Sequence, residues 1–135
     1  MSKLSFGIKT APMHTTYEGI QRVWLEADKF PEIEHAWLFD HFAPIRPPVD
    51  GPCLEGWTLL AALAAQTKNL RLGMMVTGNT YRNPAVLANM AATIDIISNG
   101  RLDFGIGAGW FEYEHTAYDI PLYKVGERIR RVDEA

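Results

Sequence analysis

The fold of this 135-residue chain is decided by one stretch, residues 70–107, with the sequence LRLGMMVTGNTYRNPAVLANMAATIDIISNGRLDFGIG. Its first segment, residues 70–77, is short and apolar and is bounded by polar residues, as strands are. Asn83-Pro84 then predicts a helix start, because asparagine caps a helix and proline fits its first turn. Asn99-Gly100 predicts the end of that helix. Residues 102–107 are again strand-like, so the stretch forms a strand–helix–strand unit.

The same alternation extends over the rest of the chain. We predict strands at residues 4–10, 35–40, 70–77 and 102–107, and helices at residues 17–30, 57–68, 84–98 and from 125 onward. Residues 42–56 are rich in proline and glycine and form a long loop, which is more often functional than decorative. The helix at 84–98 is expected to bury one apolar face, made of Val86, Leu87, Met90, Ala91, Ile94 and Ile97.

Alternating strands and helices imply a parallel sheet with right-handed crossovers. Two architectures satisfy this pattern, an open doubly wound sheet and part of a (β/α)8 barrel, and periodicity does not separate them. A complete barrel usually takes about 250 residues. In the barrel alternative, the 135 residues therefore hold only about the first four βα units, as a single partial domain over residues 1–135.

Composition excludes several classes of function. The net charge is 13 − 16 = −3 and 47% of residues are hydrophobic, which argues against intrinsic disorder and against a nucleic-acid surface. No run of about 18 uncharged apolar residues occurs, so we expect no membrane span. The amino terminus lacks the apolar core of a signal peptide, and the single Cys53 cannot form an internal disulfide. A reducing, cytoplasmic location is the expectation.

Active sites of parallel α/β folds form at the carboxyl ends of the strands. Asp40-His41 follows the second strand, where His41 could donate a hydrogen bond or a proton and Asp40 could hold a bound ring or orient His41. The alternative is that Asp40 caps a turn and His41 is merely exposed. Both interpretations stay open on the residues alone.

Three glycines, Gly105, Gly107 and Gly109, alternate along the fourth strand and past its end. Because glycine weakens a strand, this pattern needs a reason. A flat ligand lying on bare backbone is the interpretation we favour, and tight packing or a bulge is the alternative. The run is not a dinucleotide-binding motif, because Trp110 stands where a glycine would be required.

Other reactive side chains carry weaker signals. The four histidines, His14, His35, His41 and His115, show no metal-ligand spacing, so we expect no metal. Cys53 is better explained as a small loop filler than as a nucleophile. Arg82 could bind an anion at the helix start, although a surface salt bridge is the preferred interpretation. The aromatic residues Trp110, Phe111 and Tyr113 could form the wall of a pocket or simply pack.

Taken together, these motifs resemble a known family. The run from Leu70 to His115, which ends in GAGWFEYEH, is similar to luciferase-like monooxygenases, and most of all to the branch that uses the deazaflavin F420. Asp40-His41-Phe42 and Gly126-Glu127-Arg128 match the family as well. The resemblance implies a TIM-type barrel oxidoreductase that holds F420, or alternatively FMN, at its C-terminal face, where the cofactor transfers hydride or activates oxygen.

The resemblance also implies roles for individual residues. The flavin-like ring would rest on a bulge at Met75–Val76 that often contains a non-prolyl cis peptide. Asp40 would hydrogen-bond the ring system, and Ala108 and Gly109 would contact it through backbone. His41 would lie near the reacting centre as a proton donor or electrostatic partner.

Two departures from the family pattern matter. Some F420 enzymes carry a glutamate at the position of Trp110, so an acid role there is not supported. Family chains are also about twice as long, so strands five to eight and the usual cofactor-phosphate groups are expected to be missing. Open sheet edges would then favour self-association, as a homodimer or larger assembly. A catalytically inactive cofactor-binding remnant is the alternative function, and the small-molecule substrate is not determined.

Overall fold

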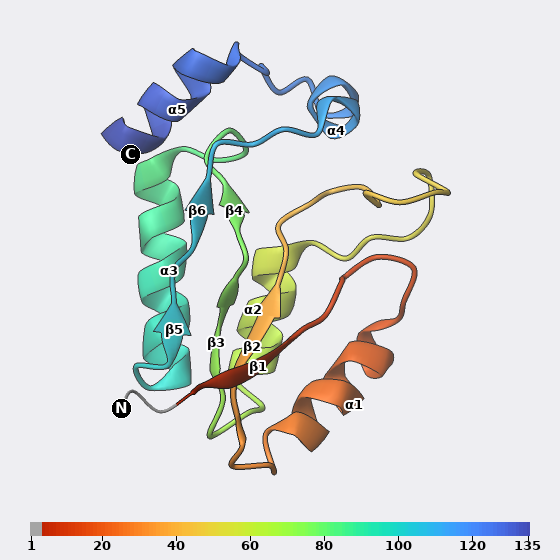
Figure 1. The fold of residues 1–135 in the computed structure, drawn as a ribbon, viewed down its shortest axis with the longest axis vertical. Helices are drawn as coiled ribbons and strands as arrows, with labels where there is room; N and C mark the ends of the chain where they lie inside the picture. Colours follow the sequence, from red (N-terminus) through yellow and green to blue (C-terminus); the bar gives the residue numbers. More distant parts are fainter. Residues whose placement is uncertain (1–3) are drawn as a thin grey trace.

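The structure is a computed structural model that describes residues 4–135. Strands and helices alternate along most of the chain (Figure 1). The strands are β1 (Phe6–Lys9), β2 (Ile33–Leu38), β3 (Arg71–Met74), β4 (Thr77–Gly78), β5 (Leu102–Asp103) and β6 (Ile106–Gly107). The helices are α1 (Tyr17–Ala27), α2 (Gly56–Ala64), α3 (Pro84–Ser98), α4 (Glu112–Ala117) and α5 (Val125–Glu134).

The strands form a four-stranded sheet in the order β1-β2-β3-β5 and a two-stranded pair of β4 and β6. Every strand pair is parallel. Each strand of the larger sheet lies beside the next one along the chain, with no reversal of order. A doubly wound sheet reverses its strand order at a switch point, whereas a barrel does not. The topology therefore selects the barrel alternative.

The core lies between the sheet and helices α1, α2 and α3. Alternation along β2 places Ala36 and Leu38 in this core, whereas His35 and Trp37 lie on the other face and are only half-buried. Trp24 and Leu60 reach the same core from α1 and α2. Complete burial of one such leucine contributes about 1.5–3 kcal/mol. The opposite face of the sheet has no such helix layer among residues 4–135.

The predicted helix boundaries agree with the structure where local capping decides them. Thr16 accepts a hydrogen bond from the Gly19 amide, and Asn83 accepts one from the Ala85 amide ahead of α3. Asn99 adopts a left-handed conformation with φ of 60° where α3 ends. The predicted start and end of α3 at Asn83 and Asn99 are confirmed.

Two helices end earlier than predicted, and side-chain contacts connect both of their ends to other segments of the chain. α1 stops at Ala27 rather than Phe30, and the carboxylate of the next residue, Asp28, accepts hydrogen bonds from three amides just before β3. α2 stops at Ala64 rather than Lys68, and the Arg101 guanidinium donates to the carbonyl groups of Ala64, the last residue of the helix, and of Thr67 beyond it. The prediction of a single apolar face on α3 was only partly right. Leu87 and Ile94 are buried, but Val86 and Ile97 are exposed.

Two strands predicted as continuous are divided. The segment at residues 70–77 is interrupted between β3 and β4 by a cis peptide bond at Met75–Val76, the position that the family resemblance implied. The segment at residues 102–107 is interrupted around Gly105, between β5 and β6. Periodicity does not reveal these breaks, because both halves of each segment remain apolar.

Beyond β6 the chain forms α4, which was not predicted, and then α5. In Figure 1 both helices lie past the carboxyl ends of the strands, and α3 and α1 lie at opposite sides of the molecule. No helix within residues 4–135 is long and apolar enough to cross a membrane.

Candidate functional site

A cavity of about 260 Å³ opens at the carboxyl ends of β2, β4 and β6. All six residues predicted to form the site line it: Asp40, His41, Met75, Val76, Ala108 and Gly109. They come from three separate segments of the chain. The parallel sheet brings these segments together because it places every carboxyl end on the same side.

Asp40 is fully buried beneath the cavity, and its carboxylate is held by two partners. Arg82 donates two hydrogen bonds to it, at 2.6 and 3.0 Å, and the Thr77 hydroxyl donates a third. Trp57 donates in turn to the Thr77 hydroxyl at 3.0 Å. Asp40 is therefore part of a buried polar network, and the simple turn-capping alternative does not describe it.

Arg82 corrects a prediction. A surface salt bridge was preferred for it, but its side chain is only 12% exposed and pairs with Asp40 and Glu55, the latter at 2.6 Å. The side chain of Glu55 also caps α2 by accepting from the Trp57 and Thr58 amides. Burial raises the pKa of Glu55, but these hydrogen bonds and the charge of Arg82 outweigh burial and lower it overall. Arg82 thus forms ion pairs with two carboxylates beside the cavity.

His41 lies in the cavity wall, and its Nδ1 is 2.7 Å from the carboxylate of Glu114 in α4. Glu114 is completely buried and also accepts hydrogen bonds from the Phe42 amide, at 2.8 Å, and from the Tyr81 hydroxyl. Sequence reasoning missed both Glu114 and Tyr81. The one available signal was the position of Glu114, shortly after the carboxyl end of the fourth strand.

The environment of Glu114 keeps it ionised. Burial raises its pKa, but hydrogen bonds from His41, Tyr81 and Phe42 outweigh burial and lower the pKa overall. The opposite holds for Tyr81, since burial and the nearby Glu114 carboxylate raise the pKa of its hydroxyl. The phenol therefore stays protonated and remains a hydrogen-bond donor to Glu114.

Cys53 supports the same region from the long loop. Its thiol donates to the backbone carbonyl of His41 at 3.4 Å. Burial, followed by the charge of Glu114, raises the pKa of the thiol to about 11. A thiol with this pKa is not activated as a nucleophile, which agrees with the structural interpretation preferred from the sequence.

The three glycines have different surroundings. A Cβ atom on Gly105 would lie 2.5 Å from the Met74 carbonyl oxygen, so close packing between strands explains this glycine. Gly107 and Gly109 line the cavity. Gly109 also has a φ of 73°, and a Cβ there would lie 2.6 Å from the Thr80 hydroxyl. The ligand interpretation thus applies at most to the last two glycines, and Gly105 follows the packing alternative.

Of the three aromatic residues after the fourth strand, only Trp110 lines this cavity. Its ring lies edge-on to His41, with 5.7 Å between centroids. Phe111 packs against His41 from another direction at 6.0 Å, and Phe111 and Tyr113 contact each other. Trp110 therefore forms part of the cavity wall, while Phe111 and Tyr113 pack beside it.

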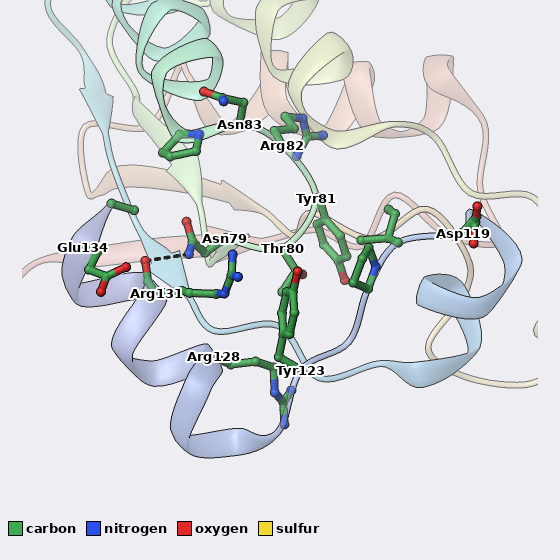
Figure 2. A pocket seen from close by; sticks show the side chains of 14 residues that line it. Asn79, Thr80, Tyr81, Arg82, Asn83, Asp119, Tyr123, Arg128, Arg131 and Glu134 are labelled. Carbon is green, nitrogen blue, oxygen red and sulfur yellow. Dashed lines mark hydrogen bonds between the residues drawn. The ribbon is translucent and has the colours of Figure 1, made fainter.

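A second cavity, of about 600 Å³, lies between the segment after β4 and α5, and Tyr81 lines both cavities. Figure 2 shows Arg128, Arg131 and Glu134 of α5 around it, opposite Asn79 and Thr80. Arg128 donates to the Gly109 carbonyl oxygen and so connects α5 to the first cavity. Its Nε atom is buried and has no hydrogen-bond partner within residues 4–135.

The unpartnered Nε of Arg128 bears on what the site could hold. A buried guanidinium N–H without an acceptor is costly unless a ligand atom accepts from it. The Arg128 side chain lines the larger cavity, so its positive charge would favour an anionic group there. Flavin and deazaflavin cofactors combine a flat ring system with a phosphate-bearing chain, so the two cavities together fit such a group. Across residues 4–135 no cluster of three His, Cys, Asp or Glu side chains is arranged to hold a metal ion.

The sequence profile of the luciferase-like monooxygenases matches residues 20–135. The chain belongs to the luciferase-like monooxygenase family. Among the curated proteins similar to this chain, an F420-dependent glucose-6-phosphate dehydrogenase of Kineococcus radiotolerans is 38% identical over 104 residues, which cover 76% of this chain and 30% of the relative. The oxygenase component of a flavin-dependent trigonelline monooxygenase of Acinetobacter baylyi is 39% identical over 98 residues, or 71% of this chain and 26% of the relative.

Solved structures share the fold of this chain. An F420-dependent secondary alcohol dehydrogenase in complex with an F420-acetone adduct superposes with a TM-score of 0.83 over 94% of this chain and 38% of that chain, at 22% identity. The α/β fold of the TIM-barrel class is therefore confirmed. The matched stretch of this chain covers less than a third of the length of each of these two curated relatives.

Proposed function

We propose that this luciferase-like chain carries the ring-binding part of an F420-dependent oxidoreductase, with FMN as the alternative cofactor. The observation that carries the proposal is the convergence of Asp40-His41, Met75-Val76 and Ala108-Gly109 on one cavity at the carboxyl ends of the strands. When bound, F420 would supply hydride transfer between its ring and a small-molecule substrate, while reduced FMN would supply oxygen activation.

The residues of the cavity have distinct parts in this proposal. The backbone at Met75–Val76 and at Ala108–Gly109 forms the surface on which a flat ring would lie. His41 faces the same space and would exchange a proton with the reactant. Asp40, held by Arg82 and Thr77, fixes the floor of the cavity and supplies a polar edge for the ring.

Arg128 would hold the anionic part of the cofactor. It contacts the Gly109 carbonyl and lines the larger cavity, and its buried Nε lacks a partner among the described residues. Arg131 lines the same cavity, and its guanidinium lies 4.0 Å from the centre of the Tyr123 ring. The smaller cavity would therefore take the ring, and the larger one would take the phosphate-bearing chain.

F420 is preferred over FMN because the stretch from Leu70 to His115 resembles the F420 branch of the family, and the relative from Kineococcus radiotolerans is F420-dependent. The flavin-dependent relative from Acinetobacter baylyi keeps FMN as the alternative. Small-molecule chemistry, self-association and a cytoplasmic location belong to the same proposal. Turnover by the isolated chain would exclude the inactive-remnant alternative.

The proposal is tested by equilibrium binding of F420 and of FMN, followed by fluorescence. Replacing Ala108 by phenylalanine narrows the ring cavity, and we expect this to weaken F420 binding at least about tenfold, a cost of about 1.4 kcal/mol. Ala117→Phe is the matched control, because Ala117 is exposed on α4 and lines neither cavity. Equal affinity of the two variants, or no binding of either cofactor by the wild-type chain, contradicts the proposal.

A further inference from the structure

Glu114 forms a buried acceptor site behind the cavity wall. Its side chain has no exposed surface, although it carries a carboxylate on the short helix α4. Three donors converge on it: the His41 ring, the Tyr81 hydroxyl and the Phe42 amide. They lie 73, 33 and 72 residues away in the chain, so tertiary folding alone creates this cluster.

We propose that Glu114 is a positioning residue that holds the proton of neutral His41 on Nδ1 and leaves Nε2 unprotonated toward the cavity. The inference deepens the proposed function and rests on it for the role of His41 in proton exchange. It assigns the orientation and the protonated atom of His41 to a residue that does not line the cavity.

The chemistry of the three donors supports this assignment. An ionised carboxylate only accepts hydrogen bonds, so the His41 nitrogen that contacts it must carry the proton. Neutral imidazole has one N–H, and the other nitrogen, Nε2, is then a free acceptor. Within residues 4–135 the structure gives Nε2 no hydrogen-bond partner. The low pKa of Glu114 keeps the carboxylate ionised as this arrangement requires.

Packing restrains the ring in the same orientation. Phe39 and Trp110 lie edge-on to His41, with centroid distances of 5.1 and 5.7 Å. When Nε2 takes a proton from a reactant, one N–H bond forms and the resulting imidazolium lies beside the Glu114 carboxylate. No proton needs to move to Glu114, which stays ionised throughout.

The test is a ¹⁵N–¹H correlation spectrum of the histidine rings in the full chain, recorded where the rings are neutral. A His41→Gln variant assigns the His41 signals among those of the four histidines. The wild-type chain should show the Nδ1–H form of His41. In Glu114→Gln the amide oxygen best accepts from the Phe42 N–H, and the NH₂ group then donates to Nδ1. His41 should therefore switch to the Nε2–H form.

Two controls separate positioning from general disruption. Glu112→Gln, which changes an exposed glutamate on the same helix, should keep the Nδ1–H form. Tyr81→Phe removes another donor to Glu114, and His41 should keep the Nδ1–H form in this variant as well. An Nε2–H form in the wild type, or an Nδ1–H form in folded Glu114→Gln, overturns the inference. If Glu114→Gln does not fold, the wild-type spectrum alone decides.

The spectrum requires no cofactor, so it is independent of the proposed function. An F420 titration of the same samples reports on that function separately. Loss of F420 binding with an intact Nδ1–H form contradicts the proposed function and supports the assignment to Glu114. If the wild-type chain binds F420 but His41 is in the Nε2–H form, the result supports the proposed function and contradicts the assignment to Glu114.

Discussion

Buried charges determine the chemistry of this chain at the scale of single residues. Asp40 and Glu114 are both completely buried, and each is surrounded by donors from distant segments. A buried carboxylate without partners is strongly unfavourable, so these donors are required for folding as well as for the cavity. The Asp40–Arg82 pair is the clearest case, because the Asp40 side chain is completely buried and the Arg82 side chain is only 12% exposed.

Replacing Arg82 by alanine leaves Asp40 buried with Thr77 as its remaining donor. We expect a loss of about 3–5 kcal/mol in the free energy of unfolding, the usual cost of breaking a buried ion pair from one side. Urea denaturation measures this loss. Arg130→Ala is the control, since Arg130 pairs with Glu127 and Glu134 on the exposed surface of α5. If the urea midpoint of Arg82→Ala is as high as that of Arg130→Ala, the buried Asp40–Arg82 pair does not stabilise the fold as expected.

Sequence reasoning reached these residues unequally. Asp40 and His41 were found because they directly follow a predicted strand. Arg82 lies 42 residues from Asp40 along the chain, and Glu114 lies 73 residues from His41. Nothing in the local pattern distinguishes Arg82 from a surface arginine, or Glu114 from the exposed Glu112. Only the folded sheet brings each pair together.

At the scale of elements, side chains next to one helix or strand form hydrogen bonds with the backbone of another segment. Asp28 follows α1, and its carboxylate accepts from the amides of Lys68, Asn69 and Leu70 ahead of β3. Arg101, just before β5, closes the end of α2 in a similar way. These contacts hold the connections on one side of the sheet at fixed positions, and they explain why α1 and α2 are shorter than their periodicity predicts.

Asp28→Asn should make stability less dependent on pH in the acid range. Burial raises the pKa of Asp28, but hydrogen bonds from Leu70, Asn69 and Lys68 outweigh burial and lower the pKa overall. A folded-state pKa below the unfolded value means that the stabilisation is present above the unfolded pKa. It is lost as the pH falls through the folded pKa. We expect the free energy of unfolding of the wild type to exceed that of Asp28→Asn by about 1–3 kcal/mol at neutral pH.

Urea midpoints of the two proteins measured over the acid range check this expectation. The two curves should converge as the pH falls. Asp50→Asn serves as the control, because Asp50 is exposed in the proline-rich loop. A constant difference between wild type and Asp28→Asn at every pH would show that the charge of Asp28 has no part in the effect.

At the scale of the whole molecule, the sheet has apolar edges and one uncovered face. Phe6 in the edge strand β1 is 61% exposed, and Phe104 at the opposite edge is 50% exposed. Val86 and Ile97 on α3 are exposed as well, although their helical face was predicted to be buried. Open strand edges with apolar side chains favour pairing with further chains.

We therefore expect the chain, expressed alone, to self-associate. Sedimentation velocity should give an average mass that rises with protein concentration. Phe6→Lys and Phe104→Lys place charges at the two edges and should each shift this rise to higher concentration. Val125→Lys, at an exposed position on α5, should leave the association unchanged. A monomer at every concentration would exclude self-association.

The sequence by itself determined the alternation of strands and helices, the caps of α3, the family and six of the residues that line the smaller cavity. These features depend on local patterns or on short motifs that follow a strand, so they can be recognised without distant contacts. The tertiary structure decided between the two architectures that periodicity left open, and it alone revealed the break between β5 and β6 and the partners of Asp40 and His41. Each of these depends on segments far apart in the chain, whose contacts exist only once the parallel sheet has brought them together.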